Sequence, residues 1–444
     1  MVDALAVAKE ILGKLKPRFT DVAVRVELID SVMVKLWNSE PSITQSWIET
    51  RVGLYLTKDG KVFVTEVSLP NVGSVEDLAR RVEKVVSALE PSEFYAPLPE
   101  PQTYTPLEGI YDPNVVKAMD DPGRYVELMV DAALAEGVDR VAGTLVLGRE
   151  FIGLATSTGF EGSEEGTEVE AYLRSFKGEF SGHWAYGSRR LDEQAIKEVG
   201  RRSGYYATLA SSKASFTPGK YDVVLSPLVV GNLANTVMFM ASAMAAAVGM
   251  SMFMKFKPGD RIGSEHVTIA DAPRDPLLAG SRSFDDEGVP TYDKAVIEKG
   301  VFKTLLHSTG TAAKMGAKST GNAGWLMPHA WNIHVSPGEF ASEEELISEL
   351  GDGIVITNNW YTRMQNYVEG IFSTVSRDAA FLVRNGEIVG YLTRIRLADK
   401  LPNLLRGWVA ATRDTYLIKW WEVETPTKAP YVLVRNVNLT KPTI

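Results

Sequence analysis

The sequence contains no cysteine among its 444 residues. This absence excludes disulfide bonds, thiolate metal sites, iron–sulfur clusters and a cysteine nucleophile. It is also typical of a reducing compartment. At the N-terminus, residues 1–19 mix acids and lysines in an amphipathic pattern, whereas a secretory signal has a continuous apolar segment. We therefore expect a cytoplasmic protein.

Basic residues are in the minority, because 47 Lys and Arg stand against 56 Asp and Glu and give a formal net charge of −9. No long block of consecutive Lys and Arg occurs. A nucleic-acid binder needs a basic patch that displaces counterions from the phosphate backbone. We therefore expect no nucleic acid among the partners of this chain.

One long segment, residues 223–254, has no charged residue at all. By length alone it is a candidate membrane helix. Pro227, Asn232, Asn235 and many alanines weaken its hydrophobicity, and no aromatic belt flanks both of its ends. The better interpretation is a strand of a soluble core followed by a buried helix, with no membrane contact.

The order of the expected elements indicates a duplicated unit in the first half of the chain. A helix, strands and a second helix follow one another twice, although such spacing is also common in unrelated α+β proteins. The expected segments are a helix over 4–15, strands over 21–69 and a helix carrying Val82, Val85 and Val86, then a helix over 123–136, strands through Tyr186 and a helix over 191–211.

Composition divides the chain into four parts. Six prolines fall between Pro91 and Pro113, which predicts an extended linker or arm between the two units. We therefore place the first α/β unit at 1–90, the arm at 91–113, the second α/β unit at 114–215 and a β-rich domain at 216–444.

The last region is predicted to be mostly β-structure, as a barrel or layered sheets. Asn385-Gly386 lies between two apolar segments and is a strong signal for a type I′ hairpin, and Lys299-Gly300 is a second turn. One helix over 342–350 begins at the capping residue Ser342. The fold class is therefore α+β, with an N-terminal α/β region followed by a mostly β domain.

Common catalytic motifs are absent, including G-x-G-x-x-G, the Walker A loop, G-x-S-x-G, H-E-x-x-H and H-E-x-x-x-H. Five histidines are present, and only His329 and His334 lie near each other. A five-residue separation places them on different faces of a helix or a strand. Packing among aromatic residues is therefore favoured over a metal site for this pair.

An acidic cluster is the sharpest local feature, with Asp285, Asp286 and Glu287 directly before Gly288. Three carboxylates could hold a cation or a peptide amine. The alternative is a turn in which Asp side chains accept backbone N–H groups and the glycine takes a positive φ. The cluster is therefore a candidate peptide-binding or structural motif.

Methionines gather in the uncharged segment, which holds six of the 13 in the chain. Methionine fills irregular cores, and clusters of it also form adaptable binding surfaces. The core is the default interpretation, and Met238, Met240 and Met244 are candidate residues of a subunit interface.

Four segments of the second half resemble a known family, TldD/PmbA, also called the modulator-of-gyrase or TldD/TldE peptidase family. The resemblance is strongest over about 216–400, and it adds Gly321 and Asn322 to the candidate peptide-binding or structural motif. The matching segments are PGDRIGSEHVTIAD (258–271), SFDDEGVPT (283–291), VIEKGVFKTLLHSTGTAAKMGAKSTGNAG (296–324) and RDAAFLVRNGEIVGYLTRI (377–395).

The resemblance implies an N-terminal α/β region, a β-rich C-terminal domain and a dimer that encloses a cavity. In this family the TldD-type subunit carries H-E-x-x-x-H on a helix after a strand like YDVVLSP, and a late cysteine completes its zinc site. That subunit degrades unfolded peptides and trims peptide precursors. The TldE/PmbA-type subunit lacks these ligands and forms the heterodimer.

This sequence departs from the zinc-binding pattern in both places. The positions where the motif would fall hold Asn235, Thr236 and Met240, and the late cysteine is missing. The resemblance therefore implies a non-catalytic, TldE/PmbA-like subunit with no catalytic or metal-binding residue and no cofactor of its own. Zinc is expected on a TldD-like partner, and the other expected partners are a peptide substrate or a second copy of this chain.

Two alternatives stay open at this point. One is a peptide hydrolase with a non-standard site, built from the acidic cluster and a distant histidine. The other is a stand-alone homodimeric scaffold that binds peptides at exposed strand edges.

Overall fold

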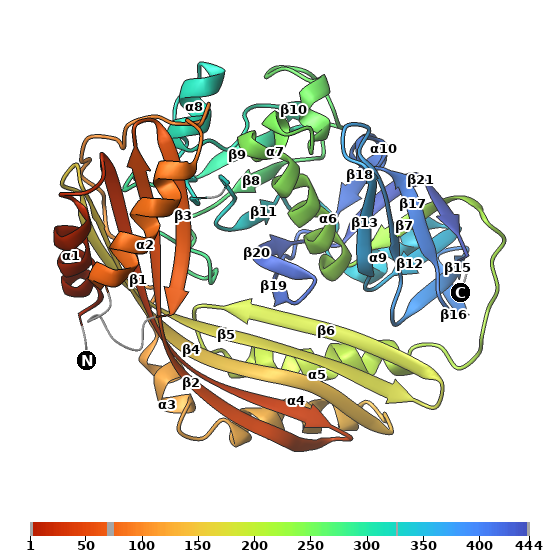
Figure 1. The fold of residues 1–444 in the computed structure, drawn as a ribbon. Helices are drawn as coiled ribbons and strands as arrows, with labels where there is room; N and C mark the ends of the chain where they lie inside the picture. Colours follow the sequence, from red (N-terminus) through yellow and green to blue (C-terminus); the bar gives the residue numbers. More distant parts are fainter. Residues whose placement is uncertain (1–2, 69–74, 326, 442–444) are drawn as a thin grey trace.

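A six-stranded antiparallel sheet of long strands dominates the N-terminal half of the computed structural model, which describes residues 3–68, 75–325 and 327–441 (Figure 1). Its order is β3-β2-β1-β4-β5-β6. The strands are β1 (Asp21–Trp37), β2 (Glu40–Lys58), β3 (Lys61–Ser68), β4 (Arg140–Thr156), β5 (Glu161–Lys177) and β6 (Phe180–Ser188).

Helices cover one face of this sheet. Strand β1 buries Val22, Val24 and Val26 completely, because alternate side chains of a strand point to the same face. They pack against a stripe of α1 formed by Ala4, Ala8, Ile11 and Leu15. The helices of this half are α1 (Ala4–Leu15), α2 (Val75–Ala88), α3 (Pro113–Ala118), α4 (Gly123–Ala135) and α5 (Glu193–Thr208).

The two units predicted from the sequence contribute three strands each to this single sheet, and β1 pairs with β4 at its centre. The proline-rich segment 91–112 forms no helix or strand and runs as an extended arm. The arm is held to the sheet by Tyr95, whose hydroxyl donates to Asp21, and by Thr158, whose hydroxyl donates to the carbonyl of Pro99.

The C-terminal half builds two further sheets. One is a six-stranded sheet of order β10-β9-β8-β11-β20-β19, and the other is a nine-stranded sheet of order β13-β14-β17-β21-β7-β12-β15-β16 with β18 beside β21. The strands of the first are β8 (Ile269–Asp271), β9 (Lys294–Glu298), β10 (Val301–Phe302), β11 (Ile333–Val335), β19 (Tyr416–Trp420) and β20 (Val423–Ala429).

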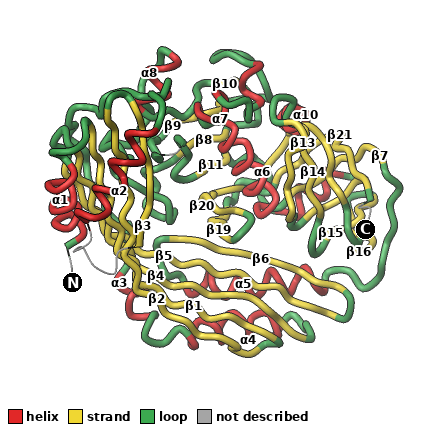
Figure 2. Tube along the Cα trace, in the orientation of Figure 1, coloured by secondary structure: helices red, strands yellow, loops and turns green. Residues whose placement is uncertain are grey.

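The strands of the nine-stranded sheet are β7 (Gly219–Leu225), β12 (Gly353–Ile356), β13 (Trp360–Asn366), β14 (Ile371–Val375), β15 (Ala380–Arg384), β16 (Glu387–Leu392), β17 (Arg396–Lys400), β18 (Trp408–Ala411) and β21 (Val432–Thr440). The helices of this half are α6 (Pro227–Met240), α7 (Ala243–Ala247), a 3-10 turn (Met252–Lys255), α8 (Thr309–Met315), α9 (Glu343–Leu350) and α10 (Leu401–Gly407). Figure 2 shows helices inserted between strands along this half. The predicted α+β class, with a mostly β C-terminal domain, is confirmed.

Strand β6 lies between the two halves of the molecule. A Cβ at Gly182 would lie 2.2 Å from the Ser203 carbonyl in α5, and a Cβ at Gly187 would lie 2.2 Å from Lys419 in β19. These glycines are five residues apart, so they face opposite sides of the strand. The long sheet therefore packs helices on one face and turns its other face toward the C-terminal half (Figure 1).

The uncharged segment forms the end of β7, the 14-residue helix α6, which is buried in the C-terminal half, and then α7 and most of the 3-10 turn. The prediction of a core strand followed by a buried helix is confirmed. In the three stretches of chain that the structure describes, no helix has the length and apolar character to cross a membrane.

Candidate functional site

Helix α6 lies where the resemblance places a metal-binding helix. It follows β7 through Ser226, and Pro227 occupies its first turn, where a missing N–H costs no helical hydrogen bond. The helix packs against β11, β19 and β20 and buries most of its side chains. Its lack of charge follows from this position, because an unpaired charge in the core is costly.

The Asn235 side chain joins α6 to β20. Its Nδ2 donates to the Thr425 carbonyl at 3.1 Å and to the Thr427 hydroxyl at 3.0 Å, and its Oδ1 accepts the Thr425 N–H at 2.9 Å. An amide carries both a donor and an acceptor, so it can satisfy both backbone groups of one residue. Asn235 therefore performs a structural task at the position expected of a zinc ligand.

Asn232, one turn earlier, connects α6 to two other elements. Its Nδ2 donates to the carbonyl and the carboxylate of Glu422, at 2.8 and 3.2 Å. Its Oδ1 accepts from Asn359 at 2.8 Å and from the Thr362 hydroxyl at 2.7 Å. These bonds hold the start of β13 and the turn between β19 and β20 against the helix.

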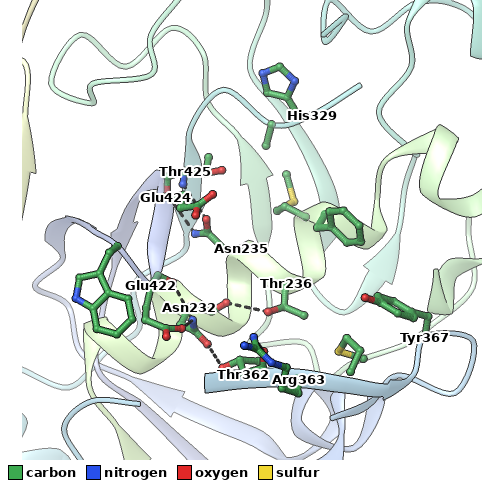
Figure 3. A pocket seen from close by; sticks show the side chains of 15 residues that line it. Asn232, Asn235, Thr236, His329, Thr362, Arg363, Tyr367, Glu422, Glu424 and Thr425 are labelled. Carbon is green, nitrogen blue, oxygen red and sulfur yellow. Dashed lines mark hydrogen bonds between the residues drawn. The ribbon is translucent and has the colours of Figure 1, made fainter. Parts of the chain in front are cut away.

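A cavity of about 630 Å³ lies beside this network (Figure 3). Its size is in the range of small-molecule sites, so it can hold a ligand such as a few residues of a peptide. Burial raises the pKa of the Glu422 carboxyl, although the Tyr361 N–H and the charge of Arg363 oppose this shift. The cavity is lined by Asn232, Asn235, Thr236, Met238, Phe239, His329, Ala330, Thr362, Arg363, Met364, Tyr367, Trp421, Glu422, Glu424 and Thr425.

The side chains on α6 do not fit a zinc site. Zinc in proteins takes thiolate, imidazole or carboxylate ligands, and the motif positions offer the amide of Asn235, the hydroxyl of Thr236 and the thioether of Met240. Met240 is completely buried. Across residues 3–68, 75–325 and 327–441, no group of three or more His, Cys, Asp or Glu side chains is arranged to hold a metal ion.

The acidic cluster is buried and lies in a tight turn. Asp285 accepts the N–H groups of Glu287, Val289 and Ala323, each at 2.9 Å, and Gly288 has a φ of +79°. Burial and the neighbouring Glu287 carboxylate raise the pKa of Asp285. Asp285 thus accepts backbone N–H groups as expected for the turn interpretation, and the turn is buried in the protein.

The other two acids of the cluster fasten this turn to its surroundings. Asp286 pairs with Arg25 of the long sheet at 2.5 Å. Glu287 accepts from the backbone N–H of Thr309 at 2.8 Å, at the start of α8. All three carboxylates therefore have protein partners. Among the described residues none of them pairs with a histidine, although the charge of Asp286 acts on the pKa of His329.

Gly321 and Asn322 belong to a neighbouring buried network. Gly321 has a φ of +68°, and its carbonyl accepts from the Trp331 indole at 2.9 Å. The Asn322 amide donates to Asp271 at 2.6 Å and to the His329 carbonyl at 2.8 Å. His334 pairs instead with Asp275 at 2.8 Å, so the two histidines of this region lie in different contacts.

The candidate interface methionines are placed differently from one another. Met238 and Met240 are buried in the core, with 2% and 0% of their surface exposed. Met240 has no exposed surface for a partner, and the little that Met238 exposes lines the cavity, so this single chain presents neither as an interface residue. Met244 in α7 is half-buried and stays a candidate.

Sequence reasoning missed an aromatic and arginine cluster at the edge of the cavity. The Arg377 guanidinium lies over the rings of Trp360 and Trp421, and the Arg363 guanidinium lies over Tyr361. The aromatic residues of this cluster are visible in the sequence segments KWWEVE and WYTR, but no local pattern indicates that these segments contact each other.

Both halves of the chain match models of one protein family. Residues 218–441 match the PmbA/TldA metallopeptidase C-terminal domain, and residues 22–89 match PmbA/TldA metallopeptidase domain 1. The metalloprotease MJ0996 of Methanocaldococcus jannaschii is 32% identical over 201 residues. That match covers 44% of this chain and 44% of the relative, so it spans less than half of the relative's length.

Two solved structures share the whole fold. A Thermotoga maritima protein, solved as a candidate modulator of a DNA gyrase, is 25% identical and superimposes with a TM-score of 0.82 over 98% of this chain and 99% of its own. TldE from Thermococcus kodakarensis also gives a TM-score of 0.82, over 98% of this chain and 100% of its own, at 19% identity. Since the C-terminal domain match alone spans half of the chain, this protein belongs to the PmbA/TldD family of metallopeptidase-like proteins.

Proposed function

We propose that this chain is the non-catalytic, TldE/PmbA-like subunit of a PmbA/TldD-type metallopeptidase. In this proposal zinc and the cleavage chemistry belong to a TldD-like partner that carries H-E-x-x-x-H. The cavity beside α6 holds part of an unfolded peptide or peptide precursor while the partner cleaves it. The complex works in the cytoplasm, without nucleic acid or membrane.

The observation that carries the proposal is the chemistry of α6. Asn235 uses its amide on β20, and Met240 is enclosed by the core, so neither is free to bind a metal ion. The likeness to PmbA of Escherichia coli O157:H7, 33% identical over 205 residues, supports the same branch of the family. The cavity supplies space and hydrogen-bonding groups for a peptide.

The proposal is tested by mixing this chain with a TldD-like homologue that carries the zinc motif. Each chain is purified alone, its zinc content is measured by mass spectrometry, and cleavage of a labelled unfolded protein is followed. We expect zinc only on the partner, a stable heterodimer by light scattering, and cleavage that rises when the two are mixed.

The matched control is the same mixture with the glutamate of the partner's zinc motif changed to glutamine. It should assemble and remain inactive. Cleavage by the isolated chain in excess chelator would overturn the proposal. So would a stable homodimer that does not bind the TldD-like chain, because that result favours a stand-alone scaffold.

A further inference from the structure

Arg377 is a half-buried cation without a direct ion-pair partner among the residues that the structure describes. Its guanidinium carbon lies 4.9 Å from the centre of the Trp360 ring and 5.1 Å from that of Trp421. Among the residues that the structure describes, no Asp or Glu oxygen lies within 4.0 Å of it. Its nitrogen atoms are also not among the described polar atoms that are fully buried and unpaired, so solvent reaches them.

The two carboxylates nearest in the chain and in space have other partners. Asp378 is bound by Arg174 through two nitrogen atoms, at 3.0 and 2.6 Å. Glu422 accepts the Tyr361 N–H at 3.0 Å with one oxygen and the Asn232 amide at 3.2 Å with the other. The unpaired state of Arg377 is therefore fixed by the surrounding hydrogen bonds.

This arrangement has a cost that a ligand could offset. Partial burial and the charge of Arg174 lower the pKa of Arg377, and the nearby charges of Asp378 and Glu422 oppose this shift only in part. An arginine stays charged under such conditions because its reference pKa is above 12. An unpaired cation in a partly desolvated site can form strong charge-assisted hydrogen bonds with an anionic ligand.

Arg377 also has a defined geometry and lies at the margin of the cavity. The planes of the two indole rings meet at 87°, and the guanidinium lies over both rings in the corner that they form. These cation–π contacts limit its movement and leave N–H groups that can donate to a ligand. Trp421 and Glu422 line the cavity and also lie next to Arg377. A ligand in the cavity could therefore extend to this guanidinium.

We propose that Arg377, placed against Trp360 and Trp421, binds a carboxylate of the peptide that occupies the cavity. The inference rests on the proposed peptide-holding function. A carboxylate matches the two parallel N–H groups of an arginine.

A peptide can supply this carboxylate in two ways, from its C-terminus or from the side chain of an Asp or Glu residue. Three peptides of one neutral, unstructured sequence separate them. The first has a free C-terminus, the second is amidated, and the third is amidated and contains one internal glutamate. Each is titrated by calorimetry into the full chain, alone and assembled with the silenced TldD-like partner described above.

We expect the free-acid peptide to bind about tenfold or more tightly than the amidated one, the effect of one charge-assisted hydrogen-bonded pair. In Arg377→Gln this ratio should fall to about one. Arg377→Lys keeps the charge without the planar pair of donors and should give an intermediate ratio. Arg140→Gln is the matched control, because Arg140 also lies over an aromatic ring, that of Phe176, but neither residue lines the cavity, and it should keep the full ratio.

The outcomes are distinguishable. If the glutamate peptide binds as tightly as the free acid, Arg377 accepts side-chain carboxylates as well, and the inference holds. Measurable and equal binding of all three peptides, or an unchanged preference for the carboxylate-bearing peptides in folded Arg377→Gln, overturns the inference and leaves the proposed function intact. If none of the three peptides binds in either state, the peptide-holding function fails and this inference fails with it.

Discussion

Arg174 in β5 and Asp378 before β15 form a two-point ion pair that joins the long sheet to the C-terminal half. The side chain of Asp378 is fully buried, and Arg174 donates to it from Nε and Nη2. The same carboxylate accepts the Asn358 amide at 2.8 Å, and Asn358 in turn lies 3.3 Å from His183 in β6. One buried network thus holds β5, β6 and the start of β15 together.

The first prediction concerns this pair. Arg174→Met leaves the Asp378 carboxylate buried without its counter-charge, which costs about 3 to 5 kcal/mol in folding free energy. Urea unfolding of the variant measures this loss. The double variant Arg174→Met/Asp378→Asn also removes the buried unpaired carboxylate and should recover part of the lost folding free energy. A single-variant loss below about 1 kcal/mol would show that the pair does not hold the halves together.

The second prediction is a pH dependence from His183. Burial lowers its pKa to about 3, opposed by the charge of Asp378 and assisted by those of Arg174 and Arg377. In the unfolded chain the imidazole titrates near 6.5, so between about pH 6.5 and 3 only the unfolded state takes up this proton. Stability therefore falls as pH drops through this window, by roughly 4 kcal/mol in total.

The measurement for His183 is the free energy of unfolding at several pH values. In His183→Gln the part of the slope between about pH 6.5 and 4 that belongs to this residue should disappear. His266 is exposed, and His266→Gln is the control that should leave the slope unchanged. Identical slopes in the unaltered chain and His183→Gln would contradict the assignment.

Much of the fold could be predicted from the sequence because its signals are local. The periodicity of residues 4–15 gives α1, and Ser342 does begin the helix that ends at Leu350. Asn385 and Gly386 have φ values of 52° and 78°, as a type I′ hairpin requires. Short helices such as α8 were not predicted, because seven residues carry too little periodicity.

The candidate site was harder to predict, because its parts come together only in the folded chain. The acidic cluster has the composition of a binding site, and only the structure shows that Arg25 and the N–H groups of Ala323 and Thr309 already occupy it. Conversely, Trp360 and Trp421 lie in separate segments, and no local pattern indicates that they enclose Arg377. Contacts between residues that are far apart in the sequence produce no periodic pattern within either segment.

The third prediction tests the structural role of α6. Asn235→Ala removes the side-chain partner of the half-buried Thr425 N–H and carbonyl beside the cavity, and a lost hydrogen bond of this kind costs about 0.5 to 1.5 kcal/mol. Thr236→Ala is the control, because the Thr236 hydroxyl only donates to the Asn232 carbonyl of the same helix, and alanine favours the helix. Chemical denaturation compares the two. Equal losses would show that Asn235 has no special role.

The fourth prediction uses two glycines in opposite situations. Gly386 has a φ of +78°, and a Cβ there would lie 3.1 Å from Ser348 Cα, so Gly386→Ala should destabilise the chain by about 1 to 2 kcal/mol. Gly13 lies inside α1 with nothing within 4 Å of an added Cβ, so Gly13→Ala should stabilise it by about 0.5 to 1 kcal/mol. Thermal unfolding of both variants gives the signs. A higher melting temperature for Gly386→Ala would show that the hairpin does not need a left-handed residue at this position. A lower one for Gly13→Ala would contradict the helix-propensity argument for α1.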